Sequence, residues 1–233
     1  MLTLERVVIR QDDFVLRVDL EVPEGAQVAV MGPSGAGKST LLSVIGGFFD
    51  ASEGAIRWQG KRIDDLPPGE RPVATIFQDN NLFPHMTAAQ NVALGIRPSG
   101  RLNRDERGQV NKALSAVGLE GFGDRKPGQL SGGQQSRAAF ARALLQDRPL
   151  LLLDEPFAAL GPAMRAEMQA LVAELARERG RTMLMVTHDP ADARRIGGQT
   201  IVVADGVAAS PVATDALLDD PPEALRAYLG SNG

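Results

Sequence analysis

The stretch that decides the fold runs from residue 32 to residue 40 and reads Gly32-Pro33-Ser34-Gly35-Ala36-Gly37-Lys38-Ser39-Thr40. It matches the phosphate-binding pattern G-x-x-x-x-G-K-[ST] at every fixed position. Its glycines let the backbone curl around a polyphosphate and aim its N–H groups inward. In this pattern Lys38 is expected to reach the β- and γ-phosphates of a nucleotide, and Ser39 to ligate Mg²⁺.

The flanks of this stretch fit a strand-loop-helix unit. Residues 27–31 are apolar enough for a short buried strand, and residues 39–45 open a helix that Gly46 and Gly47 can end. The positive end of that helix dipole would face the bound anion. A glycine-rich turn that binds nothing would need neither flank, so the sequence predicts a phosphate loop.

Composition limits the classes of protein. The chain has 233 residues, 43% of them hydrophobic and 23% charged, which suits one large globular domain or a domain with a substantial insertion. Its net charge of −4 gives no electrostatic reason to expect a nucleic-acid partner. The sequence has no cysteine, an acidic residue in the first few positions and no run of about 18 apolar residues, so we expect a soluble or peripheral protein of a reducing compartment.

The first half of the chain reads as strands followed by helices. Residues 2–22 alternate apolar and polar positions around Gln11-Asp12-Asp13, which predicts a β-hairpin. The other expected elements are a strand and turn at 54–60 with Trp58 packed inside, a buried strand at 73–77, a capping box at 87–90, and helices at 103–122 and 131–147. His85 is expected at the surface.

The second half alternates strands and helices. Residues 150–153 are four leucines, a run typical of a central parallel strand, and Asp154-Glu155 follow it. The other expected elements are an amphipathic helix from Pro162 to Gly180, a strand at 183–187 ending at His188, a strand at 201–204 with a turn at 205–206, and a helix at 222–229.

Four of these apolar strands end in polar candidates: the phosphate loop, Gln78, Asp154-Glu155 and His188. Each alone is commonly a loop hydrogen-bonder, a solvated acid or a surface histidine. In open α/β sheets, however, ligands bind beyond the carboxyl ends of the strands, so together these groups are expected to converge on one γ-phosphate.

Such a set suits attack of water on the terminal phosphate of a nucleotide. We expect Asp154 to hold Mg²⁺ through water and Glu155 to orient and deprotonate the attacking water. Gln78 is expected to contact the metal and the water, and His188 to donate a hydrogen bond to the γ-phosphate.

Leu130-Ser131-Gly132-Gly133-Gln134 forms a second hydroxyl-plus-backbone phosphate site before a helix. Because the chain already has one such site at Gly32, a second implies two half-sites completed across a dimer. The combination resembles the ATP-binding cassette (ABC) ATPases over essentially the whole chain. In that resemblance Gly32–Ser39 is Walker A, Gln78 the Q-loop, Leu130–Gln134 the signature, Leu150–Asp154 Walker B and His188 the switch histidine.

The resemblance implies an α/β fold with a RecA-like phosphate-loop core, an N-terminal antiparallel β subdomain and an inserted α-helical subdomain. The core would comprise residues 1–78 and 149–233, and the helical subdomain residues 79–148. It also implies an ATP hydrolase using ATP and Mg²⁺, and a head-to-tail homodimer at the cytoplasmic face of the inner membrane. The expected partners are integral-membrane permease subunits and, through them, a periplasmic or extracellular solute-binding protein.

Within the family, residues 78–92 look most like the ATPase subunits of bacterial importers. Residues 47–50 and 80–83 are similar to those of thiamine importers, which implies uptake of thiamine or its phosphates. An importer of iron, a polyamine or an oxyanion stays open, as does a soluble non-transport ABC protein. A plain phosphate-loop kinase is disfavoured by Leu130–Gln134.

Two positions depart from the family pattern. Gln11-Asp12-Asp13 occupies the turn where the family commonly has an aromatic residue that stacks on adenine, and Phe14 is a nearby substitute. After Walker B the chain has Ala158-Ala159-Leu160-Gly161 where Ser-Ala-Leu-Asp is usual. Gly161 therefore lacks a carboxylate that touches the dimer interface.

Overall fold

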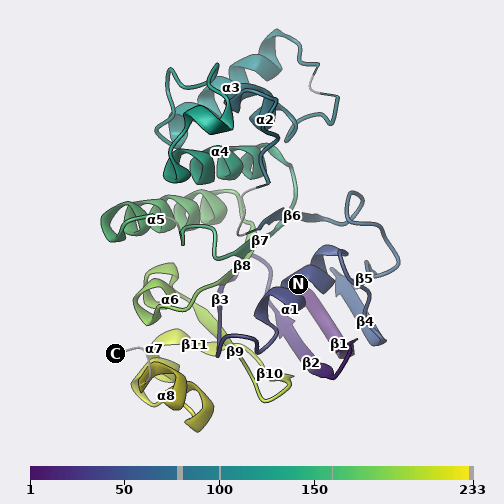
Figure 1. Ribbon diagram of the computed structural model, residues 1–233. Coiled ribbons are helices and arrows are strands. Elements are labelled where there is room, and N and C mark those ends of the chain that lie inside the picture. Colours follow the sequence, from purple (N-terminus) through teal and green to yellow (C-terminus); the bar gives the residue numbers. More distant parts are fainter. Residues whose placement is uncertain (78–80, 100, 159, 231–233) are drawn as a thin grey trace. The chain divides into compact units, whose positions relative to one another are not determined.

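The structure is a computed structural model that describes residues 1–77, 81–99, 101–158 and 160–230 (Figure 1). The chain divides into two compact units. The first unit comprises Met1–Val73, Pro149–Asp154 and Ala173–Gly233, and the second comprises Ala74–Arg148 and Glu155–Val172.

The first unit begins with an antiparallel group of strands. The hairpin predicted around residues 11–13 is confirmed, because β1 (Leu2–Gln11) pairs with β2 (Phe14–Val22) and Gln11 lies opposite Phe14. Asp12 adopts a φ of 49°, a left-handed value that Asp tolerates well in tight turns. Strand β4 (Glu53–Trp58) pairs with the other edge of β1, and β5 (Lys61–Arg62) pairs with β4. Along β2, buried Leu16, Val18 and Leu20 alternate with exposed residues, as expected for a sheet with one face in the core.

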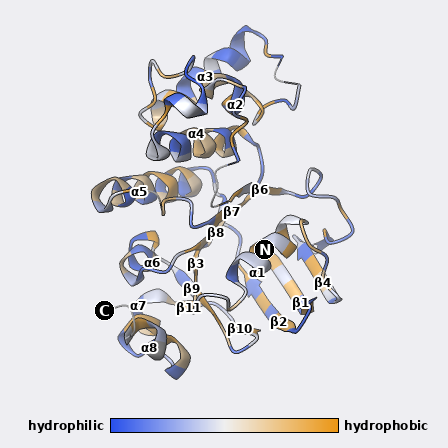
Figure 2. Ribbon diagram, viewed as in Figure 1, coloured by the Kyte–Doolittle hydropathy of each residue, from blue (hydrophilic) through white to orange (hydrophobic). Residues whose placement is uncertain are grey.

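The parallel strands of the same unit are mostly apolar (Figure 2). They are β3 (Gln27–Met31), β7 (Leu150–Asp154), β8 (Thr182–Val186) and β9 (Gln199–Ala204). Two short strands, β10 (Val207–Ala208) and β11 (Val212–Ala213), pair with β9. The strand order is β5-β4-β1-β2-β10-β9-β3-β8-β7. Strand β3 therefore lies between β9 and β8, as a central strand should.

Among the residues that the structure describes, four helices lie wholly in the first unit. Helix α1 (Lys38–Gly46) follows the phosphate loop and contacts β7 and β8. Helices α6 (Pro190–Ile196) and α7 (Thr214–Asp219) were not predicted from the sequence, because each spans only two turns or fewer and shows no clear period. The predicted C-terminal helix is confirmed as α8 (Glu223–Gly230).

The second unit contains three helices that contact one another, α2 (Ala88–Ala93), α3 (Arg104–Ala116) and α4 (Gly132–Leu145). A short 3-10 turn, η1 (Pro127–Gln129), precedes α4. The capping box predicted at Thr87 and Gln90 is confirmed. The helix predicted over residues 103–122 is too long: α3 ends at Ala116, because Gly118 takes a φ of 68° that turns the chain.

Two elements run from one unit into the other along the chain, β6 (Val73–Ile76) and α5 (Pro162–Glu178). Both were predicted from their apolar patterns. Over the described ranges, none of the helices combines the length and the hydropathy needed to cross a membrane.

Candidate active site

The phosphate loop has the backbone conformation that its glycines permit. Gly35 and Gly37 have φ values of 77° and 102°, in the region that residues with a side chain rarely adopt. Gly32 has a φ of 148°, and a Cβ built on it would overlap the carbonyl oxygen of Val203 in β9. The start of the loop therefore packs directly against β9, and the glycines at its end adopt the left-handed conformation that turns the backbone.

The side chains of Lys38 and Ser39 are held in defined positions at the start of α1. The Lys38 ammonium donates hydrogen bonds of 2.8 Å to the carbonyl oxygens of Gly32 and Pro33, so it folds back over the loop. The Ser39 hydroxyl donates to Oδ1 of Asp154 over 3.0 Å. Two residues that the sequence predicted at one metal, 115 positions apart, thus lie in direct contact.

Three of the four predicted strand ends lie side by side in the first unit. Strands β3 and β7 flank β8, and both run parallel to it. Val186 of β8 pairs with Val30 on one side and with Asp154 on the other. The chain then continues into Gly32 from β3 and into His188 from β8, so the phosphate loop, Asp154 and His188 emerge at the same edge of the sheet.

The backbone around His188 is fixed by its neighbours. Buried Thr187 accepts a hydrogen bond from the Asp189 N–H and donates one to the buried Asp192 carboxylate, with distances of 3.1 and 3.0 Å. The His188 carbonyl oxygen accepts a 3.1 Å hydrogen bond from the hydroxyl of Tyr228 in α8. The His188 side chain itself is exposed, as a residue that meets a ligand must be.

Glu155 is the first residue of the second unit's last segment and has a φ of 44°. A non-glycine residue in this left-handed region is uncommon and is often found at functional sites. Its carbonyl oxygen accepts a hydrogen bond from Ala158 N–H over 3.2 Å, which closes a tight turn. Gln78, the remaining predicted strand-end residue, lies outside the described residues.

The predicted second phosphate site lies in the second unit at the start of α4. Ser131 is the N-cap: its hydroxyl accepts from Gln134 N–H, and the Gln134 side chain accepts from Ser131 N–H. Ser131 and Gly132 are exposed. A Cβ on Gly133 would lie 2.6 Å from Cδ2 of Leu160, so a side chain there would require Leu160 to move. The Ser131 hydroxyl can still donate a hydrogen bond outward, because it uses only an acceptor position for the cap.

The structure also shows contacts that could not be predicted from the sequence. The Phe14 ring packs under the phosphate loop, and its Cζ atom lies 2.5 Å from where a Cβ of Gly37 would be. Phe14 thus supports the loop from the hairpin. Tyr228 and Arg71 likewise reach the site's framework from distant parts of the chain, and neither belongs to a local motif.

Comparison with known proteins agrees with this geometry. The ABC transporter family matches residues 15–158, and the chain belongs to this family. Two of its relatives are the thiamine import ATP-binding proteins ThiQ of Cereibacter sphaeroides, 60% identical over 99% of this chain and 100% of that protein, and of Ruegeria sp., 55% identical over the same shares.

A solved structure is similar over nearly the whole chain. It is the dimeric ATP-binding cassette MJ0796 in a post-hydrolysis state bound to ADP and Pi, with a TM-score of 0.81 and 33% identity over 92% of this chain and 99% of that one. The predictions of an ABC ATPase and of its α/β cassette fold are therefore confirmed.

Proposed function

We propose that the chain is the ATP-binding subunit of a bacterial thiamine importer and that it couples ATP hydrolysis to uptake of thiamine or its phosphates. The observation that carries the proposal is the full-length similarity to two proteins named for thiamine import, at 60% and 55% identity. The contact between Ser39 and Asp154 beneath a complete phosphate loop supports the ATPase part.

We further propose that Mg²⁺ binds with the nucleotide at Ser39, Asp154 and Gln78, with Asp154 acting through water. The Ser39 hydroxyl and the Asp154 carboxylate, 3.0 Å apart, are hard oxygen donors of the kind Mg²⁺ prefers. In the described parts of the chain no three His, Cys, Asp or Glu side chains cluster as a metal site. That suits Mg²⁺, which commonly takes few protein ligands and completes its shell with water and substrate phosphates. The ion would neutralise charge on the phosphates during transfer.

The proposed roles of the remaining residues follow from their positions. Lys38 would turn from the loop carbonyls to the β- and γ-phosphates, while backbone N–H groups from Gly32 to Thr40 cradle them. Glu155 would accept the proton of the attacking water, and His188 would donate a hydrogen bond to the γ-phosphate. Gln78 would contact the water and the metal.

We propose that the active form is a homodimer in which Ser131, Gly132, Gly133 and Gln134 of one copy complete the phosphate site of the other. The exposure of Ser131 and Gly132 supports this, as does the dimeric state of the similar cassette structures. The helical subdomain would span residues 79–148. Permease subunits, and through them a solute-binding protein, would place the dimer at the cytoplasmic face of the inner membrane.

Uptake of labelled thiamine at low concentration tests the transport proposal. Deleting the gene should abolish uptake, and the wild-type chain should restore it while the Lys38→Ala variant should not. Unchanged thiamine uptake together with lost uptake of iron, a polyamine or an oxyanion would reject thiamine and leave the ATPase intact.

A further inference from the structure

The phosphate-loop helix α1 has no cation of its own at its C-terminal end. Its last turn contains no basic residue, although the carbonyl groups there carry the negative end of the helix dipole. Backbone N–H groups satisfy part of this end, since Gly47 N–H donates to Val44 O and Phe48 N–H donates to Ser43 O. A cation from elsewhere in the chain would stabilise this end.

Arg71 supplies it. This side chain is almost fully buried, with 2% of its surface exposed. Its Nη1 donates to the carbonyl oxygens of Val44 and Ile45 in α1, over 2.7 and 3.0 Å. Burial lowers the pKa of the Arg71 guanidinium, while the nearby Asp64, Asp50 and Asp65 favour its charged form. Arginine remains protonated in proteins, so a full positive charge lies at the C-terminal end of α1.

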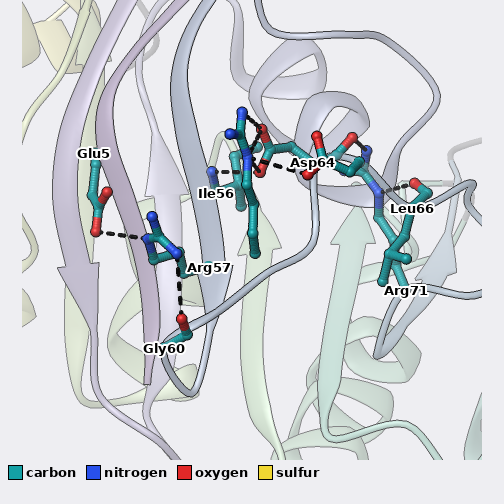
Figure 3. A network of polar contacts seen from close by, with 9 residues as sticks. Glu5, Ile56, Arg57, Gly60, Asp64, Leu66 and Arg71 are labelled. Carbon is teal, nitrogen blue, oxygen red and sulfur yellow. Dashed lines mark hydrogen bonds and ion pairs between the residues drawn. The ribbon is translucent and has the colours of Figure 1, made fainter.

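The same guanidinium also binds the segment that leads to Arg71. Its Nε donates to Leu66 O over 2.8 Å, and its Nη2 donates to Asp64 O over 3.0 Å (Figure 3). The planar fork of arginine thus joins four carbonyl groups from two segments. Lysine has one nitrogen and cannot reach both segments in the same geometry.

The neighbouring residues fit around this group. Gly47 has a φ of 84°, and a Cβ there would lie 2.5 Å from Arg71 Nε, so the glycine is required for both its conformation and its small size. The Asp64 carboxylate accepts from Ile56 N–H of β4 at 3.0 Å and from the Arg62 guanidinium. Figure 3 shows this chain of contacts from β4 through Asp64 to Arg71. The network anchors the end of α1 to the antiparallel strands.

We propose that Arg71 is a positioning residue for nucleotide binding: it fixes the far end of α1 so that Lys38 and Ser39 at its near end keep their phosphate-binding geometry. The inference rests on the proposal that Lys38 and Ser39 bind the nucleotide. Packing against β7 and β8 holds α1 in the core, and the Arg71 hydrogen bonds fix its last turn, where helices otherwise fray.

The expected effect is a loss of nucleotide affinity larger than the loss of turnover. If removal of the guanidinium leaves the competent arrangement of α1 populated about one-tenth of the time, the apparent Kd for ATP rises about tenfold. Once ATP is bound, the chemical groups at the other strand ends are unchanged. KM for ATP should therefore rise while kcat at saturation is largely kept.

The experiment measures the Kd of Mg-ATP by titration calorimetry, KM and kcat, and the melting temperature, on the full chain. Arg71→Met, which removes the donors, should raise Kd about tenfold, and Arg71→Lys should raise it less. Ile63→Ala is the matched control, since Ile63 is a buried core residue whose apolar side chain cannot donate a hydrogen bond to the carbonyl groups of α1. It should lower the melting temperature and leave Kd unchanged.

The proposal is overturned if the Arg71 variants lose thermal stability and keep the wild-type Kd, or if Ile63→Ala raises Kd equally. Should Arg71→Met fail to fold, Arg71→Lys decides, because it keeps the positive charge and removes the planar fork. Lys38→Ala in the same titration separates the proposal for Arg71 from the proposed nucleotide site. If Lys38→Ala too keeps full affinity, the assignment of the nucleotide site is wrong, rather than the role of Arg71.

Discussion

The contact between Tyr228 and His188 allows a prediction whose size follows from the structure. Tyr228→Phe removes one hydroxyl, which donates a 3.1 Å hydrogen bond to the His188 carbonyl oxygen, and keeps the aromatic ring. Such a bond contributes about 1 kcal/mol net. If all of it holds His188 in position for the γ-phosphate, kcat falls about fivefold, since about 1.4 kcal/mol corresponds to tenfold.

The assay is steady-state ATP hydrolysis by the purified chain over a range of ATP concentrations. Because the Tyr228 hydroxyl bonds the His188 backbone, the substitution should act on the step that uses His188, so KM should change little while kcat falls. Arg226→Ala is the control on the same helix: it removes an exposed ion pair with Asp220 and no contact with His188. An unchanged kcat in Tyr228→Phe, or an equal fall of kcat in Arg226→Ala, would show that the Tyr228 hydrogen bond does not position His188 for hydrolysis.

Three further predictions concern other parts of the chain. Lys38→Ala should abolish productive ATP binding, because the cation that would meet the β- and γ-phosphates is lost; unchanged affinity and turnover in an ATP-binding assay would count against it. Gly161→Asp should tighten the ATP-dependent dimer and raise ATPase activity with little change in melting temperature. A Cβ at Gly161 meets no atom within 4 Å, and the gain from a better N-cap over glycine is about a few tenths of a kcal/mol. A large change in melting temperature with unchanged dimerisation would contradict this prediction. Asp64→Asn should lower the melting temperature at neutral pH: burial raises the pKa of Asp64, but hydrogen bonds from Arg62 and Ile56 outweigh this and lower it. The carboxylate therefore stabilises the fold above its ordinary pKa of about 4, and this contribution is lost as the pH falls through the lower pKa of the folded state. The difference in melting temperature between variant and wild type, measured by thermal unfolding, should therefore shrink below about pH 4 and not grow.

The sequence predicts the parts of this protein that depend on local patterns. The buried strands, the capping box at Thr87 and the turn at Asp12 each depend on residues that are neighbours in the sequence. The proximity of Ser39 and Asp154 could also be predicted, because parallel strands bring their carboxyl ends to one edge of the sheet.

The contacts of Arg71, Phe14 and Tyr228 could not be predicted in the same way. Each joins segments that are distant in sequence, by 26 and 27 positions for Arg71 and by 40 for Tyr228. An arginine before a strand or an aromatic residue in a terminal helix can contact many different groups. Only the tertiary packing determines which of these contacts forms. The end of α3 was misplaced for a related reason, since apolar Val117 and Leu119 continue the helical pattern past the turn at Gly118.

The most direct test of the central claim is to compare ATP binding, hydrolysis and oligomeric state in the wild-type chain and in Glu155→Gln. The amide keeps the shape of the side chain but cannot accept the proton of the attacking water. We expect the variant to bind Mg-ATP with near wild-type affinity, to hydrolyse almost none of it and to elute as an ATP-bound dimer in size-exclusion chromatography. A variant that hydrolyses ATP at the wild-type rate, or that binds ATP and stays a monomer, would contradict a composite ATPase site built on Glu155.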